Sequence, residues 1–347
     1  MKRLTLFATI MLAAFVACSP QNPATGLIAD GVQTPVKIGV VTDLTGPASY
    51  WGESTRVGAE LAAQELKDEG YEVDLIFESY PLSAKEALTA AQKLVNIDDV
   101  DAIYSEFNPG AIAVGSFVKE LPVLHVYDAA AVSPLEGAPY TYKTYLNYKA
   151  GCREITQRFK DEGVRKIGVL KINLEFGELC LEGVKEIYDY PAVESYDLGD
   201  QDFRTQFLKL KNAGAEAVIN VGFEGDTLNA LKVIKEQKLN IRYGTVADTI
   251  TNQVTEQHST ELTGSLSFGF VEVDPKFKDK LTTKLSTDYA AALAYTHIKQ
   301  IVKAISACGD HYDCIAIKMD AASSDSTIGF QGFKHHIAEL EMQITSR

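Results

Sequence analysis

Cysteine and histidine side chains are the first candidates for chemistry in this chain, because they bind metals, act as nucleophiles or form disulfides. The sequence has five cysteines and six histidines. It contains no Cys-x-x-Cys pair, and Cys308 and Cys314 are separated by Gly-Asp-His-Tyr-Asp, which is not a zinc-ligand spacing. The histidines near the C-terminus form no ligand pattern either: His297, His311, His335 and His336. We therefore predict no metal site.

Disulfide formation is the better interpretation of the four cysteines that follow Cys18. Four thiols in an oxidising compartment allow three connectivities. We predict local pairing, of Cys152 with Cys180 and of Cys308 with Cys314. Buried free thiols remain the alternative.

Motifs of common enzyme classes are absent from the sequence. There is no Gly-x-Ser-x-Gly nucleophile turn, no Walker phosphate loop, no Gly-x-Gly-x-x-Gly after a strand and no His-Glu-x-x-His. We therefore predict that the protein is not an enzyme, and that it uses no cofactor.

The N-terminal stretch has the pattern of an export signal. Lys2 and Arg3 precede a short apolar run that ends in Phe-Val-Ala-Cys18. A run of about fourteen residues is too short to span a bilayer, and small residues precede the cleavage point. We predict a lipoprotein signal peptide over residues 1–17, an acylated Cys18, and a flexible linker over residues 18–35. A signal peptide with an incidental cysteine is the alternative.

Net charge and hydrophobicity limit the possible partners. The formal charge is −14 at pH 7, and it becomes −16 once Lys2 and Arg3 leave with the signal. An acidic chain repels phosphate backbones and anionic head groups, so we expect no nucleic-acid partner. No later run approaches the ~20 apolar residues of a spanning helix, so the membrane would be reached through the lipid anchor only. The expected location is extracytoplasmic, facing the periplasm or the cell surface.

Hydrophobic periodicity predicts an α/β fold with two lobes. Predicted strands (36–42, 73–77, 102–104, 122–126, 166–172, 215–221 and one near 241) alternate with predicted helices (53–68, 83–95, 178–188, 226–238 and 288–306). Continuous apolar strands are typical of parallel sheets covered on both faces. About 310 residues exceed one core, so we expect two doubly wound parallel-sheet lobes joined by crossover strands, with a ligand cleft between them. Lobe 1 would comprise 36–147 and 275–322, and lobe 2 would comprise 148–274 and 323–347.

A known pattern begins at Lys37-Ile-Gly-Val-Val-Thr-Asp-Leu-Thr-Gly-Pro-Ala-Ser-Tyr-Trp-Gly52. Further segments follow in the same order: Ala91-Gln-Lys-Leu-Val-Asn96, Arg165-Lys-Ile-Gly-Val-Leu170, Glu175-Phe-Gly177, residues 203–214 and Asp288-Tyr-Ala-Ala-Ala-Leu-Ala-Tyr295. Over about residues 36–335 the chain resembles the type I periplasmic binding proteins of the leucine/isoleucine/valine-binding class. The resemblance implies their bilobed fold and a small ligand held between the lobes.

The resemblance also implies which residues contact that ligand. The family places an aromatic residue before the glycine of the first turn against the ligand, and here that residue is Trp51, the only tryptophan. An indole offers a flat apolar face and one N–H donor. Phe176 and Phe223 would be second-lobe walls, and Asp248 would meet a ligand ammonium. A core or surface role is the alternative for each.

Two first-lobe loops depart from the family pattern. Amino-acid binders of the family hold the ligand carboxylate with hydroxyls and backbone N–H groups in these loops. Here Asn108 or Pro109 stands in the usual serine position, Val132 replaces the usual threonine, and Glu106 adds negative charge. We therefore expect free amino acids to bind poorly and a neutral or cationic ligand to bind better. The candidate contacts in these loops are Asn108, Asp128, Ala130 and Val132.

The leading hypothesis is a lipid-anchored solute-binding protein that delivers a small polar organic ligand, amino-acid-like or an amide, to an ABC permease. The alternative is a ligand sensor or envelope-assembly lipoprotein that uses the same fold to engage a protein partner. A secreted hydrolase is a third and weaker hypothesis.

Overall fold

The structure is a computed structural model, and it describes residues 34–325, 327–340 and 342–347. The predicted signal peptide, Cys18 and nearly all of the predicted linker lie outside the described residues. None of the helices within the described ranges combines the length and the apolar content that crossing a bilayer requires.

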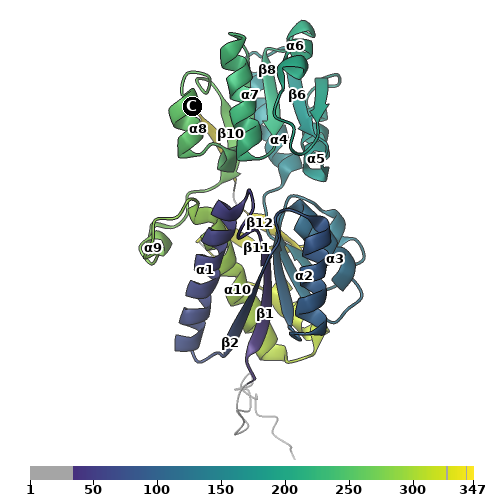
Figure 1. Ribbon diagram of the computed structural model, residues 1–347, viewed down its shortest axis with the longest axis vertical. Coiled ribbons are helices and arrows are strands. Elements are labelled where there is room, and N and C mark those ends of the chain that lie inside the picture. Colours follow the sequence, from purple (N-terminus) through teal and green to yellow (C-terminus); the bar gives the residue numbers. More distant parts are fainter. Residues whose placement is uncertain (1–33, 326, 341) are drawn as a thin grey trace, which may run out of the picture. The chain divides into compact units, whose positions relative to one another are not determined.

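The first sheet has seven strands in the order β11-β12-β5-β4-β3-β1-β2 among the described residues (Figure 1). Five of its strands pair in parallel and precede the second lobe in the chain: β1 (Val36–Thr42), β2 (Val73–Ser79), β3 (Ala102–Glu106), β4 (Leu124–Asp128) and β5 (Thr141–Lys143). Strands β3 and β4 are buried along their whole length. Helices therefore cover both faces, as the apolar runs predict.

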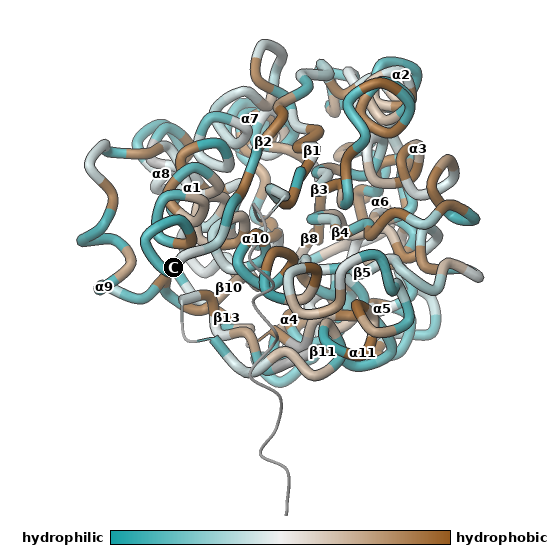
Figure 2. The backbone as a smooth tube through the Cα atoms, turned by 90° about the horizontal axis from the view of Figure 1, so that it is seen from below, coloured by the Kyte–Doolittle hydropathy of each residue, from teal (hydrophilic) through white to brown (hydrophobic). Residues whose placement is uncertain are grey.

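The helices of this lobe are α1 (Ser49–Asp68), α2 (Ala84–Asn96), α3 (Asn108–Val118), α10 (Asp288–Cys308) and α11 (Tyr312–Asp320), with the short helix η1 (Ser133–Leu135). Helix α10 returns to pack against α1, where a Cβ on Gly58 would lie only 2.0 Å from the Ala291 carbonyl oxygen. Figure 2 shows hydrophobic and hydrophilic residues alternating along the turns of α2, which is typical of a helix that covers a sheet.

The second sheet has the order β13-β10-β9-β8-β6-β7. Its strands are β6 (Ile167–Ile172), β7 (Ala192–Tyr196), β8 (Ala217–Val221), β9 (Arg242–Val246), β10 (Leu266–Phe270) and the antiparallel β13 (Met342–Ser346). Its helices are α4 (Tyr148–Asp161), α5 (Glu175–Lys185), α6 (Arg204–Asn212), α7 (Glu224–Glu236), η2 (Ala247–Thr249) and α8 (Asn252–His258). Helix α9 (Pro275–Lys278) lies in the connection from β10 to α10.

The C-terminal segment differs from the expected division, which places all of 323–347 in lobe 2. Strands β11 (Phe330–Lys334) and β12 (Ile337–Leu340) form a hairpin that joins the first sheet beside β5, and only β13 joins the second. The hairpin is fixed by aromatic packing of Tyr142 on Phe333 and His336. The two short strands contain no continuous apolar run, so periodicity gives no sign of where they pair.

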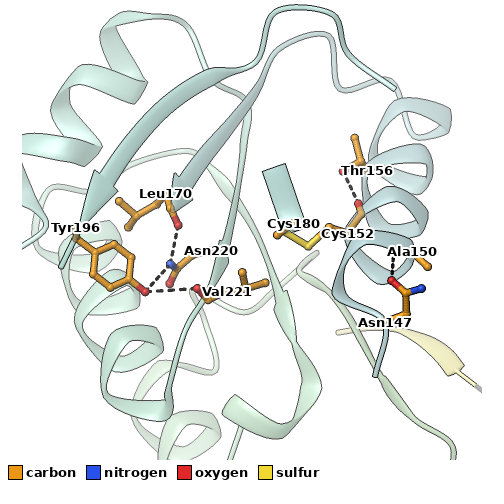
Figure 3. Close-up of a disulfide and its surroundings, with 9 residues drawn as sticks. All are labelled: Asn147, Ala150, Cys152, Thr156, Leu170, Cys180, Tyr196, Asn220 and Val221. Carbon is orange, nitrogen blue, oxygen red and sulfur yellow. Dashed lines mark hydrogen bonds between the residues drawn. A yellow bond between two sulfur atoms is a disulfide. The ribbon is translucent and has the colours of Figure 1, made fainter. Parts of the chain in front are cut away.

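Both predicted disulfides are confirmed. Cys152 on α4 is bonded to Cys180 on α5 (Figure 3), and Cys308, the last residue of α10, is bonded to Cys314 on α11. Helices α4 and α5 approach closely, since a Cβ on Gly183 would lie 2.1 Å from the Lys149 carbonyl oxygen.

Candidate functional site

A cavity of about 60 Å³ lies where strand ends of the two lobes meet. Cavities that bind drug-sized molecules measure several hundred Å³, so this cavity is much smaller than those. Seven of the eight residues predicted to contact a ligand line it: Trp51, Asn108, Asp128, Ala130, Phe176, Phe223 and Asp248. These residues follow β1, β3, β4, β6, β8 and β9, so the site lies at the carboxyl ends of parallel strands. Their role in binding stays a prediction.

Val132 does not line the cavity. Its side chain is 37% exposed, and its backbone N–H donates to Glu175 Oε1 over 2.7 Å. Position 132 directly precedes η1, where the chain has already left the cavity wall. The absence of a threonine hydroxyl at position 132 therefore does not change the cavity lining. It changes only the region where the two lobes make contact.

The first-lobe wall is built on the turn after β1. The Asp43 carboxylate accepts hydrogen bonds from the backbone N–H groups of Thr45, Gly46 and Ala48, which closes the turn and starts α1. A Cβ at Gly52 would lie 2.1 Å from the Asp43 carbonyl oxygen, so only glycine fits after the tryptophan. This packing places Trp51 in the first turn of α1, against the cavity.

The indole N–H of Trp51 is used inside the protein. It donates to Glu106 Oε1 over 2.9 Å, so it is not the ligand donor that the sequence suggests. The same oxygen accepts from Thr55 Oγ1 over 2.5 Å, and the Thr42 hydroxyl bonds to the other carboxyl oxygen. Burial raises the pKa of Glu106 to about 7. Trp51 can therefore offer a ligand only its ring.

The Asp128 carboxyl lies at the end of β4 and is also buried. The hydroxyls of Tyr104 and Thr144 donate to it, and burial together with the nearby Glu106 raises its pKa to about 8. The adjacent Lys143 ammonium donates to the carbonyls of Tyr145 and Leu146 over 2.6 and 3.1 Å, and burial lowers its pKa to about 7. Lys143 thereby fixes the segment that leaves the first lobe.

Two polar atoms of the cavity wall have no protein partner. The Asn108 side-chain oxygen accepts from the Ala131 N–H over 3.1 Å, which sets the orientation of the amide and leaves its Nδ2 donor unpaired. Asp248 Oδ2 accepts from the Tyr145 hydroxyl, and Oδ1 is buried without a partner. Burial raises the pKa of Asp248 to about 6. Two lining residues thus each contain a buried polar atom, one donor and one acceptor, without a side-chain or backbone partner at hydrogen-bond geometry.

Aromatic rings make up most of the remaining wall. Besides the predicted ones, the lining includes rings that sequence reasoning missed: Tyr50, Phe107, Tyr145 and Tyr148. Tyr145 and Tyr148 lie where the chain passes from β5 to α4, and the tyrosine spacing along 140–148 is the signal that could have revealed them. Phe107 has a φ of +57°, which is rare for a residue with a side chain and is typical of functional sites.

Comparison with known proteins establishes the family. A sequence profile of the periplasmic binding protein family matches residues 35–344. The chain belongs to this family. A leucine-, isoleucine-, valine-, threonine- and alanine-binding protein of Pseudomonas aeruginosa is 23% identical over 353 residues, which cover 94% of this chain and 90% of that protein.

Solved structures show the same fold. A solute-binding protein of an R. palustris ABC transporter, in complex with 4-hydroxybenzoate, has a TM-score of 0.80 at 19% identity and covers 90% of this chain and 93% of its own. A leucine-binding protein from Thermotoga maritima has a TM-score of 0.77 at 18% identity and covers 90% and 95%. The present chain is therefore a type I periplasmic binding protein of the leucine/isoleucine/valine-binding class.

The buried carboxyl beneath Trp51 makes the stability of this periplasmic binding protein depend on pH. Folded Glu106 holds its proton up to about pH 7, whereas the unfolded chain releases it near pH 4.5. Stability is therefore lost as pH rises from about 5 to 7, by about 1 kcal/mol per pH unit. Glu106→Gln imitates the protonated group, so urea unfolding at pH 5, 6 and 7 should show this variant gaining stability over wild type as pH rises. The exposed Glu60→Gln is the control, and a pH-independent difference for Glu106→Gln would contradict the assignment.

Proposed function

We propose that this protein is an extracytoplasmic solute-binding protein that captures a small organic molecule between its lobes and delivers it to an ABC importer. The observation that supports this most is the cavity itself, whose aromatic walls come from both lobes and whose wall carries an unpaired donor and acceptor. Of the relatives named above, one is a leucine-, isoleucine-, valine-, threonine- and alanine-binding protein and another is a solute-binding protein in complex with 4-hydroxybenzoate. All of these ligands are small organic molecules.

A free amino acid is not the ligand that these residues favour. No lysine or arginine is among the described residues that line the cavity. Helix α3 begins beside it, but Pro109 removes one of the N–H groups that a helix N-terminus offers to an anion. A ligand carboxylate would also approach the carboxylate of Asp248 without a compensating cation.

The ligand class and the role of Trp51 can be tested together. A thermal-shift screen of amino acids, amides, amines and aromatic acids should give stabilising compounds, because binding to the folded state alone raises stability. Leucine should bind weakly or not at all.

For the best compound, calorimetry should show that Trp51→Ala lowers the affinity about tenfold or more, because the ring contact is lost. Tyr190 is 96% exposed, so the control variant Tyr190→Ala should leave the affinity unchanged. Micromolar leucine binding that Trp51→Ala leaves unchanged would overturn the proposal.

Ligand capture is proposed to stabilise the contact between lobes. The Glu175 carboxylate, at the start of α5 in the second lobe, accepts from the N–H groups of Val132 and Ser133 over 2.7 and 3.1 Å and from the Ser133 hydroxyl over 2.7 Å. The acceptor and the donors belong to different lobes, so these bonds form only when the lobes are together. They do not involve the cavity wall, and they add to the free energy of closure around a ligand.

Glu175→Ala should therefore weaken binding without touching the ligand. Hydrogen bonds to a charged group contribute about 1.5 to 3 kcal/mol each when buried and less when exposed, so we expect roughly a tenfold loss of affinity, expressed as faster dissociation. Stopped-flow measurements on Glu175→Ala and on the same-helix control Glu182→Ala would show this. Equal dissociation rates for both variants and wild type would rule out a role for the Glu175 hydrogen bonds in holding the lobes together around a ligand.

The lipid anchor is a separate proposal that the cleavage box supports. Cys18→Ala should give an unprocessed precursor or a product that takes up no fatty-acid label, because no other segment is proposed to carry the lipid. Radiolabelling of cells that express the variant measures this directly, and normal labelling would refute the role of Cys18.

A further inference from the structure

The cavity is acidic and contains no cationic side chain that could neutralise an anionic ligand. Asp128 and Asp248 line it, and Glu106 lies behind Trp51. The nearest buried cation, Lys143, already donates to two backbone carbonyls. Any positive charge that balances the cavity wall must therefore come from the ligand.

The rings of the cavity form one continuous series across both lobes. Phe107 contacts Trp51 with ring centroids 6.3 Å apart, and Trp51 contacts Tyr145 at 6.1 Å. Tyr145 stacks on Tyr148 at 6.1 Å, which meets Phe176 edge-on at 5.4 Å. Phe176 in turn meets Phe223 at 6.0 Å.

Such walls attract cations. The face of an aromatic ring carries negative charge, and a cation within about 6 Å of its centroid is stabilised, more so where water is excluded. Aromatic cages of this composition recognise ammonium groups. A neutral aromatic ligand would also pack here, but it would leave the charge of Asp248 unbalanced.

The two unpaired atoms specify the rest of the ligand. Asp248 Oδ1 requires a donor or a positive charge, and Asn108 Nδ2 requires an acceptor. An acceptor that carries full negative charge would meet the negative charge of Asp248 and would find no cation among the lining residues. The acceptor on the ligand is therefore neutral, such as a hydroxyl or amide oxygen.

We infer that the ligand is a small organic ammonium compound whose cation lies among the aromatic rings against Asp248 and whose neutral oxygen accepts a hydrogen bond from Asn108. This inference rests on the proposed function, because it names the class of solute that the same cavity takes. It separates this chain from the amino-acid and aromatic-acid binders among its relatives.

Matched pairs of probes test the inference on the unmodified full chain. Choline is compared with 3,3-dimethylbutan-1-ol, in which carbon replaces the charged nitrogen, and leucinamide is compared with leucine, in which a carboxylate replaces the amide. Trp51 is the only tryptophan and lines the cavity, so its fluorescence reports occupancy. In at least one pair the ammonium compound with a neutral oxygen should bind about tenfold or more tightly than its counterpart.

Three outcomes overturn the inference and are distinct from one another. Equal or tighter binding of the alcohol would exclude the ammonium class. Equal or tighter binding of leucine, which carries the same ammonium group as leucinamide, would exclude the requirement for a neutral oxygen. Either result would leave the proposed function intact. No saturable change with either ammonium probe up to about 10 mM would also exclude the ammonium class, and if the thermal-shift screen then finds no ligand, the proposed function fails as well.

The charge of Asp248 is tested by a variant that keeps its shape. Asp248→Asn can still accept from Tyr145, so the cavity should persist. We expect about a tenfold loss of affinity for the bound ammonium probe and little change for a neutral one. Asp189→Asn, at an exposed aspartate of the same lobe, should change neither. An equal loss for charged and neutral probes would indicate a changed cavity shape and contradict the assigned role.

Discussion

The hydrogen bonds that surround the Glu106 carboxyl are the interaction on which the rest of the site depends. They join three elements: the end of β3, the end of β1 through Thr42, and the first turns of α1 through Trp51 and Thr55. A buried carboxyl without such donors would destabilise the fold, so these side chains are held in one arrangement. The indole ring is thereby fixed as a wall, and Phe107 and Asn108 leave β3 at a defined angle.

The same carboxyl sets the electrostatics of the cavity. Glu106 and Asp128 lie on neighbouring strands, and each disfavours the ionised form of the other. In the free protein at neutral pH, Asp128 is therefore mostly protonated and Glu106 about half protonated, which lowers the cost of burying them. A cation in the cavity would shift that balance toward the charged forms, so occupancy and protonation are coupled.

Strand ends could be predicted from the sequence because parallel strands carry long apolar runs. The run at 36–42 predicts the bounds of β1 without error, and the runs at 102–104 and 122–126 locate β3 and β4 within a few residues. Candidate residues that directly follow such strands, among them Asn108, Asp128 and Phe223, consequently line the cavity.

Helix α3 could not be predicted, since it begins with Asn-Pro-Gly, a sequence typical of turns. Tyr145 lies just before α4 and Tyr148 is its first residue, in a segment that the Lys143 ammonium holds through the Tyr145 and Leu146 carbonyls, a local contact that no periodicity encodes. Val132 lies outside the lining, and position in a loop does not indicate which side of the loop faces the cavity.

The departures from the family pattern form a consistent set. The carboxylate-binding relatives use hydroxyl donors at the start of α3 and after β4, and here those positions hold Asn108-Pro109 and a run of three alanines, none of which has a hydroxyl. Two hydroxyls nearby, those of Tyr104 and Thr144, are already bonded to Asp128. Each change alone would only weaken anion binding. Together they replace a donor-rich pocket with acceptors and ring faces, and a pocket of that kind discriminates by repelling the wrong charge as much as by attracting the right one.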